Sequence, residues 1–263
     1  MPADATDPRA AEWRARAWAA GGELLLLGSA GPAAHRSVLR VGDVIGADLG
    51  VPHPWGVRIT AGDGLPLADD ARTGLAWCRE RGARTGWRVC VPERLVGTGP
   101  WQGLVERDRS GVFATSATVA AALDPGPTGG VELVDEPTRT EIVAAYGGWM
   151  SDPSLAELLV TPDDVERPDR RFLVARLDGS AVGCAFVWWA AGTGYLSGIG
   201  VVPHLRGRGI GRLLTAAAAR TAAAGPGGEP PDVVWMHATP AGAQLYDRMG
   251  FRLVDAEVLV GPA

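Results

Sequence analysis

One glycine- and arginine-rich segment contains the residue types needed to bind a phosphate group. It reads IGVVPHLRGRGIGR from Ile199 to Arg212, and it leads from a strand-like stretch into an amphipathic helix pattern. The first N–H groups of a helix have no acceptor within it, so they can bind an anion. Glycine allows close approach to the backbone, and arginine adds positive charge. The candidate phosphate contacts are Arg206, Gly207, Arg208, Gly209, Ile210, Gly211 and Arg212.

The lack of lysine in the chain and the spacing of the glycines exclude several classes of phosphate-binding protein. All 25 basic side chains counted as lysine or arginine are arginine. A P-loop NTPase, a protein kinase and a Schiff-base enzyme each need a lysine, so these classes are excluded. The dinucleotide fingerprint G-x-G-x-x-G fails because the sixth position counted from Gly207 is Arg212. A nicotinamide oxidoreductase is therefore disfavoured.

A second motif follows the first along the chain. Residues 243–251 read AQLYDRMGF, which predicts a short helix that carries Tyr246 and is stopped by Gly250. Together with Arg206-x-x-Gly209-x-Gly211, preceded by Val-Val-Pro, this motif resembles the GNAT superfamily of N-acetyltransferases. The resemblance covers about residues 131–260. It implies a GNAT-like mixed, mostly antiparallel sheet flanked by helices, preceded by a second, smaller α/β domain.

The resemblance also implies roles for individual residues. The glycine–arginine loop would bind the coenzyme A diphosphate through backbone amides, and the backbones of Ile199 and Val201 would pair with the pantetheine arm. Thr239 stands where the family often has an asparagine that contacts coenzyme A. Tyr246 would protonate or hydrogen-bond the departing sulfur. The implied co-substrate is acetyl-CoA, the acceptor is a primary amine of a small molecule or a peptide, and no metal is expected.

Other interpretations of these residues remain open. The glycine-rich turn could be a plain connector, and Tyr246 could be a packed core tyrosine. The chain could also be a non-catalytic acyl-CoA sensor or interaction module that keeps the cofactor loop. Tyr246 argues against this alternative, and the lack of a carboxylate base argues for it. The family often has a glutamate base on the strand before the loop, but residues 195–202 contain no carboxylate. The base could be His237, Ser197 acting through water, or no protein group. Trp188 and Trp189 are interpreted as core and sheet-surface residues.

Apolar periodicity predicts the elements that position these motifs. In the second half we expect one strand, then two helices, then three strands. A helix with apolar residues on one face follows from Ile210. An Asp178-Gly179 pair predicts a tight hairpin between two of these strands. The expected strands cover residues 131–134, 171–177, 181–189, 195–202, 233–239 and 251–260, and the expected helices cover 137–146, 153–160, 210–224 and 240–249.

A cluster of proline and glycine at residues 124–130 predicts a domain boundary. We expect an N-terminal α/β domain over residues 1–125, as a degenerate GNAT-like copy without the coenzyme A loop, and a catalytic domain over residues 126–263. The N-terminal half is less regular. Its expected helices cover residues 12–20 and 67–81, and its expected strands cover 37–44, 57–61, 87–91 and 112–117.

Composition limits the partners and the compartment. The net charge of −5 argues against a broad nucleic-acid surface, and no apolar run is long enough to span a membrane. The first residues lack the pattern of a signal peptide. Cys78, Cys90 and Cys184 are widely spaced and odd in number, which favours reduced thiols in the cytoplasm. We expect acetyl-CoA and an amine as partners, no nucleic acid and no membrane, and a homodimer remains open.

Overall fold

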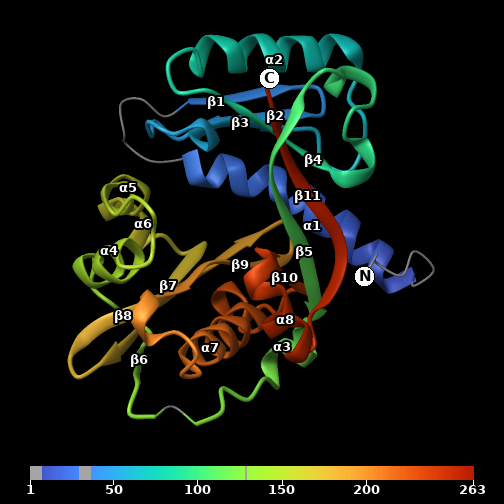
Figure 1. Cartoon of the computed structure of the whole chain (residues 1–263). Coiled ribbons are helices and arrows are strands. Elements are labelled where there is room, and N and C mark those ends of the chain that lie inside the picture. The colour runs from blue at the N-terminus through green and yellow to red at the C-terminus, as the bar shows by residue number, and fades with distance from the viewer. Residues whose placement is uncertain (1–7, 30–36, 128) are drawn as a thin grey trace. The chain divides into compact units, whose positions relative to one another are not determined.

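The computed structural model describes residues 8–29, 37–127 and 129–263. The chain divides into two compact units, each of which has its own strands and helices (Figure 1). The first consists of Met1–Ala114, His237–Asp247 and Arg252–Ala263, and the second of Thr115–Met236 and Arg248–Phe251. The last strand therefore packs with the first unit. Whether the two domains expected on either side of residue 125 act as separate functional domains stays a prediction.

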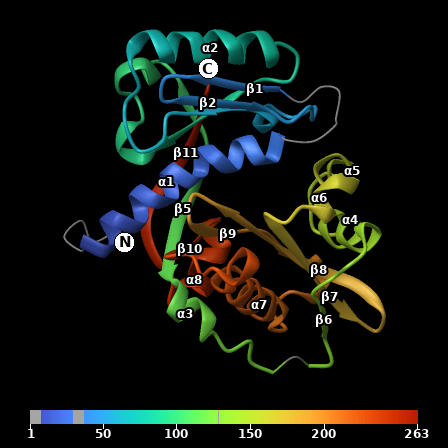
Figure 2. The same ribbon diagram turned by 180° about the vertical axis from the view of Figure 1, so that it is seen from behind.

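The strands of the first unit follow the order β1-β2-β3-β4-β11-β5. Adjacent strands are antiparallel, except that β3 and β4 are parallel. Helices α1 and α2 contact opposite faces of this sheet (Figures 1 and 2). The bounds are α1 Pro8–Ser29, β1 Ser37–Val41, β2 Val44–Asp48, β3 Val57–Thr60, α2 Ala68–Arg81, β4 Arg88–Pro92, β5 Val105–Ser116 and β11 Arg252–Gly261.

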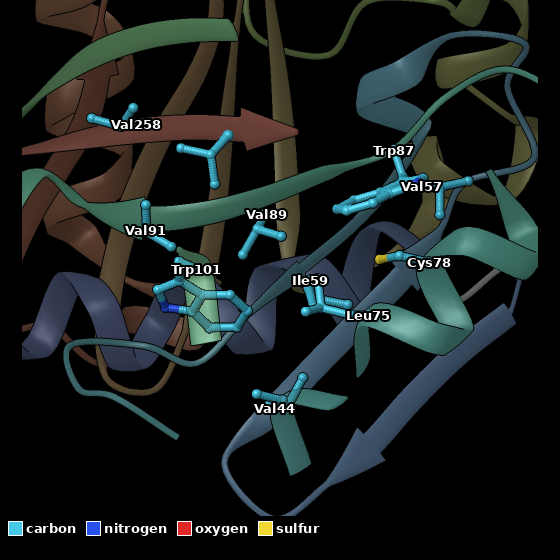
Figure 3. Packing of buried hydrophobic residues seen from close by; sticks show 12 residues of the cluster. Val44, Val57, Ile59, Leu75, Cys78, Trp87, Val89, Val91, Trp101 and Val258 are labelled. Carbon is cyan, nitrogen blue, oxygen red and sulfur yellow. The ribbon is translucent and has the colours of Figure 1, made fainter. Parts of the chain in front are cut away.

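The face of this sheet beneath α2 forms an apolar core (Figure 3). Alternation along each strand turns every second side chain toward the helix, as Ile59 of β3 and Val258 of β11 illustrate. The indole of Trp101 fills this core and is 1% exposed. Cys78 of α2 also lies there, and burial raises the pKa of its thiol to about 12. Hydrophobic burial on this face therefore holds α2 to the strands.

The second unit contains the strand run β10-β9-β8-β7-β6. Strands β9 and β10 are parallel and the other pairs are antiparallel. The mixed, mostly antiparallel architecture flanked by helices is therefore confirmed. The bounds are α3 Ala117–Ala121, β6 Glu132–Val134, α4 Arg139–Gly147, α5 Ser154–Leu159, α6 Pro162–Glu166, β7 Arg170–Leu177, β8 Ser180–Ala190, β9 Thr193–Val201, α7 Ile210–Ala224 and β10 Val233–Ala238. Helix α8, Pro240–Arg248, belongs to the first unit except for its last residue.

Helices α4 and α7 lie on opposite faces of β8 and β9. A Cβ on Gly183 would approach Leu214 of α7, whereas the next residue, Cys184, contacts Trp149 just after α4. Successive strand residues point to opposite faces, so this pair assigns one helix to each face. The buried stripe of α7 includes Ile210, Leu213 and Leu214, as the helical spacing predicts.

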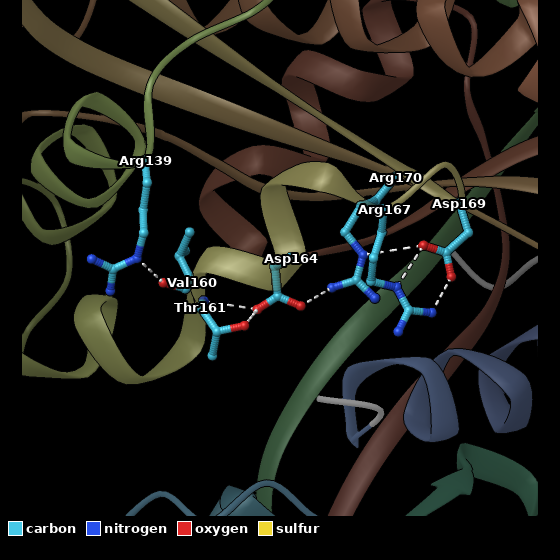
Figure 4. Close-up of polar contacts among 7 residues, drawn as sticks. All are labelled: Arg139, Val160, Thr161, Asp164, Arg167, Asp169 and Arg170. Carbon is cyan, nitrogen blue, oxygen red and sulfur yellow. Dashed lines mark hydrogen bonds and ion pairs between the residues drawn. The ribbon is translucent and has the colours of Figure 1, made fainter. Parts of the chain in front are cut away.

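A buried polar network joins α6 to the start of β7 (Figure 4). The guanidinium of Arg170 is 1% exposed and pairs with Asp164 and, at 3.3 Å, with Asp169. Asp164 also accepts hydrogen bonds from the backbone N–H and hydroxyl of Thr161, at 2.8 and 2.7 Å. A hydrogen bond from Arg167 lowers the pKa of Asp169. Because a buried charge needs such partners, the network holds the short helix against the strand.

Some sequence predictions hold and others do not. The Asp178-Gly179 hairpin is confirmed, with positive φ at both residues. The expected single strand over residues 37–44 is wrong, because Gly42 has a φ of 50° and turns the chain between β1 and β2. Helices α3 and α6 were not predicted, since each is only five residues long.

Across residues 8–29, 37–127 and 129–263, no helix combines the length and apolar character of a membrane span. Within the same ranges, no group of three or more His, Cys, Asp or Glu side chains is arranged to hold a metal ion.

Candidate functional site

The glycine-rich loop leads from β9 through a 3-10 turn, Pro203–Leu205, into α7. Gly207 and Gly209 have φ values of 77° and 83°, a left-handed conformation that glycine adopts without strain. Gly209 is the N-cap residue of α7, and as a glycine it makes no side-chain hydrogen bond to the helix N-terminus. The N–H of Leu213 bonds to the carbonyl of Gly209 at 3.0 Å, so the N–H groups of residues 210–212 have no acceptor within the helix. They are suited to bind an anion.

The arginines of the loop differ in what they contact. Arg206 Nε donates to the carbonyl of Val201 at 3.1 Å and so ties the loop to the end of β9. Arg212 Nε and Nη2 both lie 3.4 Å from the carbonyl of Asp124. Arg208 is exposed. Arg206 therefore has a structural contact that the sequence did not predict, in addition to any contact with phosphate.

Strand β9 has different pairing on its two edges. Its ladder with β10 ends at Leu196↔Met236, whereas its ladder with β8 continues to Val201↔Gly183. Ser197, Gly200 and Val201 are thus paired on the β8 edge beyond the end of the described β10 ladder, and Ile199 lies between them in the same stretch of β9. A strand edge of this kind can pair with an extended ligand through its backbone.

The same part of β9 contains a bulge. Gly198 has a φ of 57°, and the β8–β9 register shifts between Cys184 and Phe186. A Cβ on Gly198 would lie 2.6 Å from the ring of Phe186. The bulge re-aims the backbone at this point, which is a common use of a bulge next to a functional site.

Tyr246 lies on α8 and is 8% exposed. Burial raises the pKa of its phenol to about 12. Its ring meets Phe113 edge-on, with 6.4 Å between centroids. Gly242, one helical turn earlier, leaves room for the ring, since a Cβ there would lie 2.9 Å from Tyr246 Cε2. Tyr246 is thus a packed tyrosine as well as a candidate for catalysis.

Thr239 immediately precedes α8 and is exposed. Its carbonyl accepts from the N–H groups of Gly242 and Ala243 at 2.9 and 3.0 Å, so its backbone starts the helix. Two residues earlier, His237 Nε2 lies 3.4 Å from Glu257 Oε2. The sequence motifs did not predict a role for Glu257. It precedes the buried Val258 on β11, so the two side chains point to opposite faces of the sheet.

The predicted residues belong to two compact units. Those of the loop and β9, from Ile199 to Arg212, belong to the second unit, and Thr239 and Tyr246 belong to the first. The tryptophan pair serves packing, since Trp189 is buried and donates to the carbonyl of Ala222 at 3.0 Å. The guanidinium carbon of Arg170 lies 4.0 Å from the ring centre of Trp188. The assigned roles of the loop residues, Thr239 and Tyr246 stay predictions.

Part of the chain matches a known family, and the fold is similar to that of solved proteins. The family model described as acetyltransferase (GNAT) domain matches residues 168–253. None of the curated proteins matches the chain. A solved GCN5-related N-acetyltransferase from Kribbella flavida is similar in structure, with a TM-score of 0.70, 22% identity and 95% of each chain covered.

Two further solved structures show the same fold. A tandem GNAT protein from the clavulanic acid biosynthesis pathway has a TM-score of 0.58 and 16% identity, with 98% of this chain and 97% of that chain covered. A GCN5-related N-acetyltransferase from Sphaerobacter thermophilus has a TM-score of 0.52 and 19% identity, covering 94% and 89%. The likeness extends over almost the whole chain, beyond the matched domain.

Proposed function

Because residues 168–253 form a GNAT acetyltransferase domain, we propose that the protein moves an acetyl group from acetyl-CoA directly to a primary amine of a small molecule or a peptide. One observation carries the proposal. A glycine turn with positive φ at Gly207 and Gly209 precedes the uncapped N-terminus of the fifteen-residue helix α7. Such a terminus suits a diphosphate, with its unpaired N–H groups and its positive dipole end.

The residues present fit coenzyme A. Among the residues that the structure describes, nothing lies within 4 Å of a Cβ built on Gly207, so they leave the loop open on that side. The backbone N–H groups of residues 207–212 would hold the diphosphate, with Arg206, Arg208 and Arg212 supplying charge. The edge of β9 at Ile199 and Val201 would pair with the pantetheine amides. Thr239 keeps the role that the resemblance implies for it, a hydroxyl contact to coenzyme A. When bound, acetyl-CoA supplies the activated acyl thioester.

The chemistry sets two demands on the protein. An alkylammonium with a pKa near 10.4 must lose a proton before it attacks, which costs about 4.6 kcal/mol at pH 7. The departing thiolate must also be stabilised. With a pKa of about 12, Tyr246 is fully protonated at neutral pH. Complete transfer to a thiolate of pKa near 8.5 would be uphill by roughly 5 kcal/mol, so Tyr246 acts as a hydrogen-bond donor.

We further propose that residues 126–263 are the catalytic domain and that residues 1–125 are a degenerate GNAT-like copy. The structural match to the tandem GNAT protein extends over almost the whole chain and supports this proposal. In the described ranges Cys78, Cys90 and Cys184 are free and buried, and this supports a reducing, cytoplasmic location. The proposal includes no metal and no nucleic-acid or membrane partner. It does not specify whether the protein is a monomer or a homodimer, which a measurement of the molecular mass in solution would decide.

Binding and turnover together test the proposal. Isothermal calorimetry with acetyl-CoA should show one site per chain, and a thiol reagent should detect coenzyme A release that depends on an added amine. Binding without amine-dependent release would identify an acyl-CoA sensor and contradict the transfer reaction. Failure to bind acetyl-CoA would remove the assignment of the loop.

A further inference from the structure

A chain of hydrogen bonds reaches the bulge of β9 in the second unit. The indole Nε1–H of Trp149 donates to Sγ of Cys184 at 3.5 Å, and the thiol of Cys184 donates to the carbonyl of Gly198 at 3.4 Å. Burial raises the pKa of Cys184 to about 12, so the thiol keeps its proton at neutral pH and can donate. The chain therefore ties the segment after α4 to the backbone of β9 through a side chain of β8.

The bulge places the carbonyl of Gly198 at the end of this chain. The register between β8 and β9 shifts between Cys184 and Phe186, where β9 has one residue more than β8. Gly198 has a φ of 57° at this point, and the ring of Phe186 closes on it. A bulge disrupts the ladder of hydrogen bonds between two strands. The thiol of Cys184 supplies a partner for the carbonyl of Gly198 there.

The bond to Gly198 also sets the direction of the next N–H group. The carbonyl of Gly198 and the N–H of Ile199 belong to one peptide unit, which is planar and trans, so the two groups point in opposite directions. Because the carbonyl faces the thiol of Cys184 on β8, the N–H of Ile199 points away from that thiol. This direction suits a donor to a ligand along the edge of β9 that does not pair with β8.

Trp149 restricts the same stretch of β9. A Cβ on Gly200 would lie 2.0 Å from Trp149 Cε2, so the indole rests on the backbone one residue beyond Ile199. The indole also packs edge-on against Tyr146 of α4, with 5.2 Å between ring centroids. Its N–H occupies an acceptor position of the Cys184 sulfur, and this directs the thiol proton to the carbonyl.

We propose that Cys184 and Trp149 are positioning residues of the acetyl transfer, which hold the peptide between Gly198 and Ile199 so that the N–H of Ile199 donates to the carbonyl oxygen of the thioester. This inference rests on the proposed function. Negative charge develops on that oxygen when the amine attacks, and a donor that is already in place stabilises it. Both side chains act through the backbone of β9.

The first experiment separates turnover from binding. Cys184→Ala removes the donor to Gly198 and should lower kcat about two- to tenfold, the effect of one ordinary hydrogen bond, while calorimetry gives the same affinity for acetyl-CoA. Cys184→Ser keeps a donor and should recover most of the loss. Cys78→Ala, at another buried free thiol, is the control and should change neither quantity.

Two results of this experiment would overturn the role of Cys184. One is an unchanged kcat in Cys184→Ala. The other is a folded Cys184→Ser variant that binds acetyl-CoA and is as slow as Cys184→Ala.

The second experiment observes the thioester carbonyl and needs no acceptor amine. Acetyl-CoA labelled with carbon-13 at that carbonyl is bound to the protein, and its isotope-edited infrared band is recorded. A hydrogen bond weakens the C=O bond, so the band in the wild type should lie at a lower wavenumber than in free acetyl-CoA. Cys184→Ala should move the band toward the free value, and Cys78→Ala should not. The same band in the wild type and in Cys184→Ala would overturn the proposal, since a change in stability alone does not shift it.

The third experiment tests Trp149. Trp149→Phe keeps an aromatic ring but removes the N–H that donates to the sulfur of Cys184. It should lower kcat about twofold in the wild type and have little further effect in Cys184→Ala, because the thiol that it directs is then absent. Losses that multiply in the double variant would show that the two residues act separately, and would overturn the role of Trp149.

The proposed function and the positioning role fail differently. A wild-type protein that binds acetyl-CoA but acetylates no amine would overturn the proposed function, and the role in transfer with it. A wild-type protein that acetylates amines, together with an equally active Cys184→Ala variant and an unshifted carbonyl band, would overturn the positioning role alone.

Discussion

The indole ring of Trp149 packs directly on the backbone of Gly200. A Cβ built on Gly200 would lie 2.0 Å from Trp149 Cε2, closer than any real contact allows. The indole Nε1 lies 3.5 Å from Cys184 Sγ, whose own acceptor is the carbonyl of Gly198 at 3.4 Å. The tryptophan that follows α4 therefore requires glycine at this position of β9.

Replacement of this glycine should destabilise the protein. Gly200→Ala is expected to lower the free energy of unfolding by about 1 to 3 kcal/mol, because the extra methyl group overpacks against the indole. Thermal denaturation should report a fall in Tm of several degrees. In a Trp149→Ala background the same change should cost much less, so the double-mutant cycle should give a clear coupling energy. Additive effects would contradict the contact.

Replacement of the candidate tyrosine should separate binding from turnover. Tyr246→Phe keeps the ring that meets Phe113 edge-on but removes the hydroxyl. We expect kcat to fall about 10- to 100-fold, the worth of a hydrogen bond to a charged group, with little change in acetyl-CoA affinity. Steady-state kinetics and calorimetry measure the two quantities. An unchanged kcat would remove the assigned role.

Replacement of the loop arginine should affect the cofactor. Arg206→Ala is expected to weaken acetyl-CoA binding about tenfold, because it removes charge near the diphosphate and the contact to the carbonyl of Val201. Arg220→Ala, on a later turn of α7, is the matched control and should bind normally. Equal affinity in calorimetry for Arg206→Ala and the wild type would count against the loop assignment.

The buried phenol predicts a pH dependence. Burial raises the pKa of Tyr246 from 10.0 to about 12. A raised folded-state pKa means that the neutral phenol contributes stability that is fully present below pH 10 and is lost as the pH rises through about 12. The difference in tyrosinate absorbance between wild type and Tyr246→Phe should have its midpoint near pH 12. A midpoint near 10 would show that the ring is exposed.

Local patterns predict much of the second half of the chain. The helical spacing from Ile210 and the turn at Asp178-Gly179 depend on neighbouring residues, and both features appear as expected. The hairpin at Gly42 was missed because apolar residues continue on both sides of the turn. A short helix such as α3 has too few residues to show a period.

Contacts between residues far apart in the sequence limit how much of the candidate site can be predicted from the sequence. The two motifs and their residues were visible as local patterns. The partner of His237 was not, because Glu257 reaches its position only through the pairing of β11 with β4 and β5. The contact from Arg206 to Val201 likewise depends on how the loop closes onto the strand. Sequence spacing cannot report contacts that only the folded sheet creates.

The most direct measurement is coenzyme A release from acetyl-CoA in the presence of a panel of primary amines, with the product identified by mass spectrometry. The account predicts thiol release that requires an amine and yields the acetylated amine in equal amount. Bound acetyl-CoA that stays intact with every amine tested, or thiol release without an acetylated product, would contradict it.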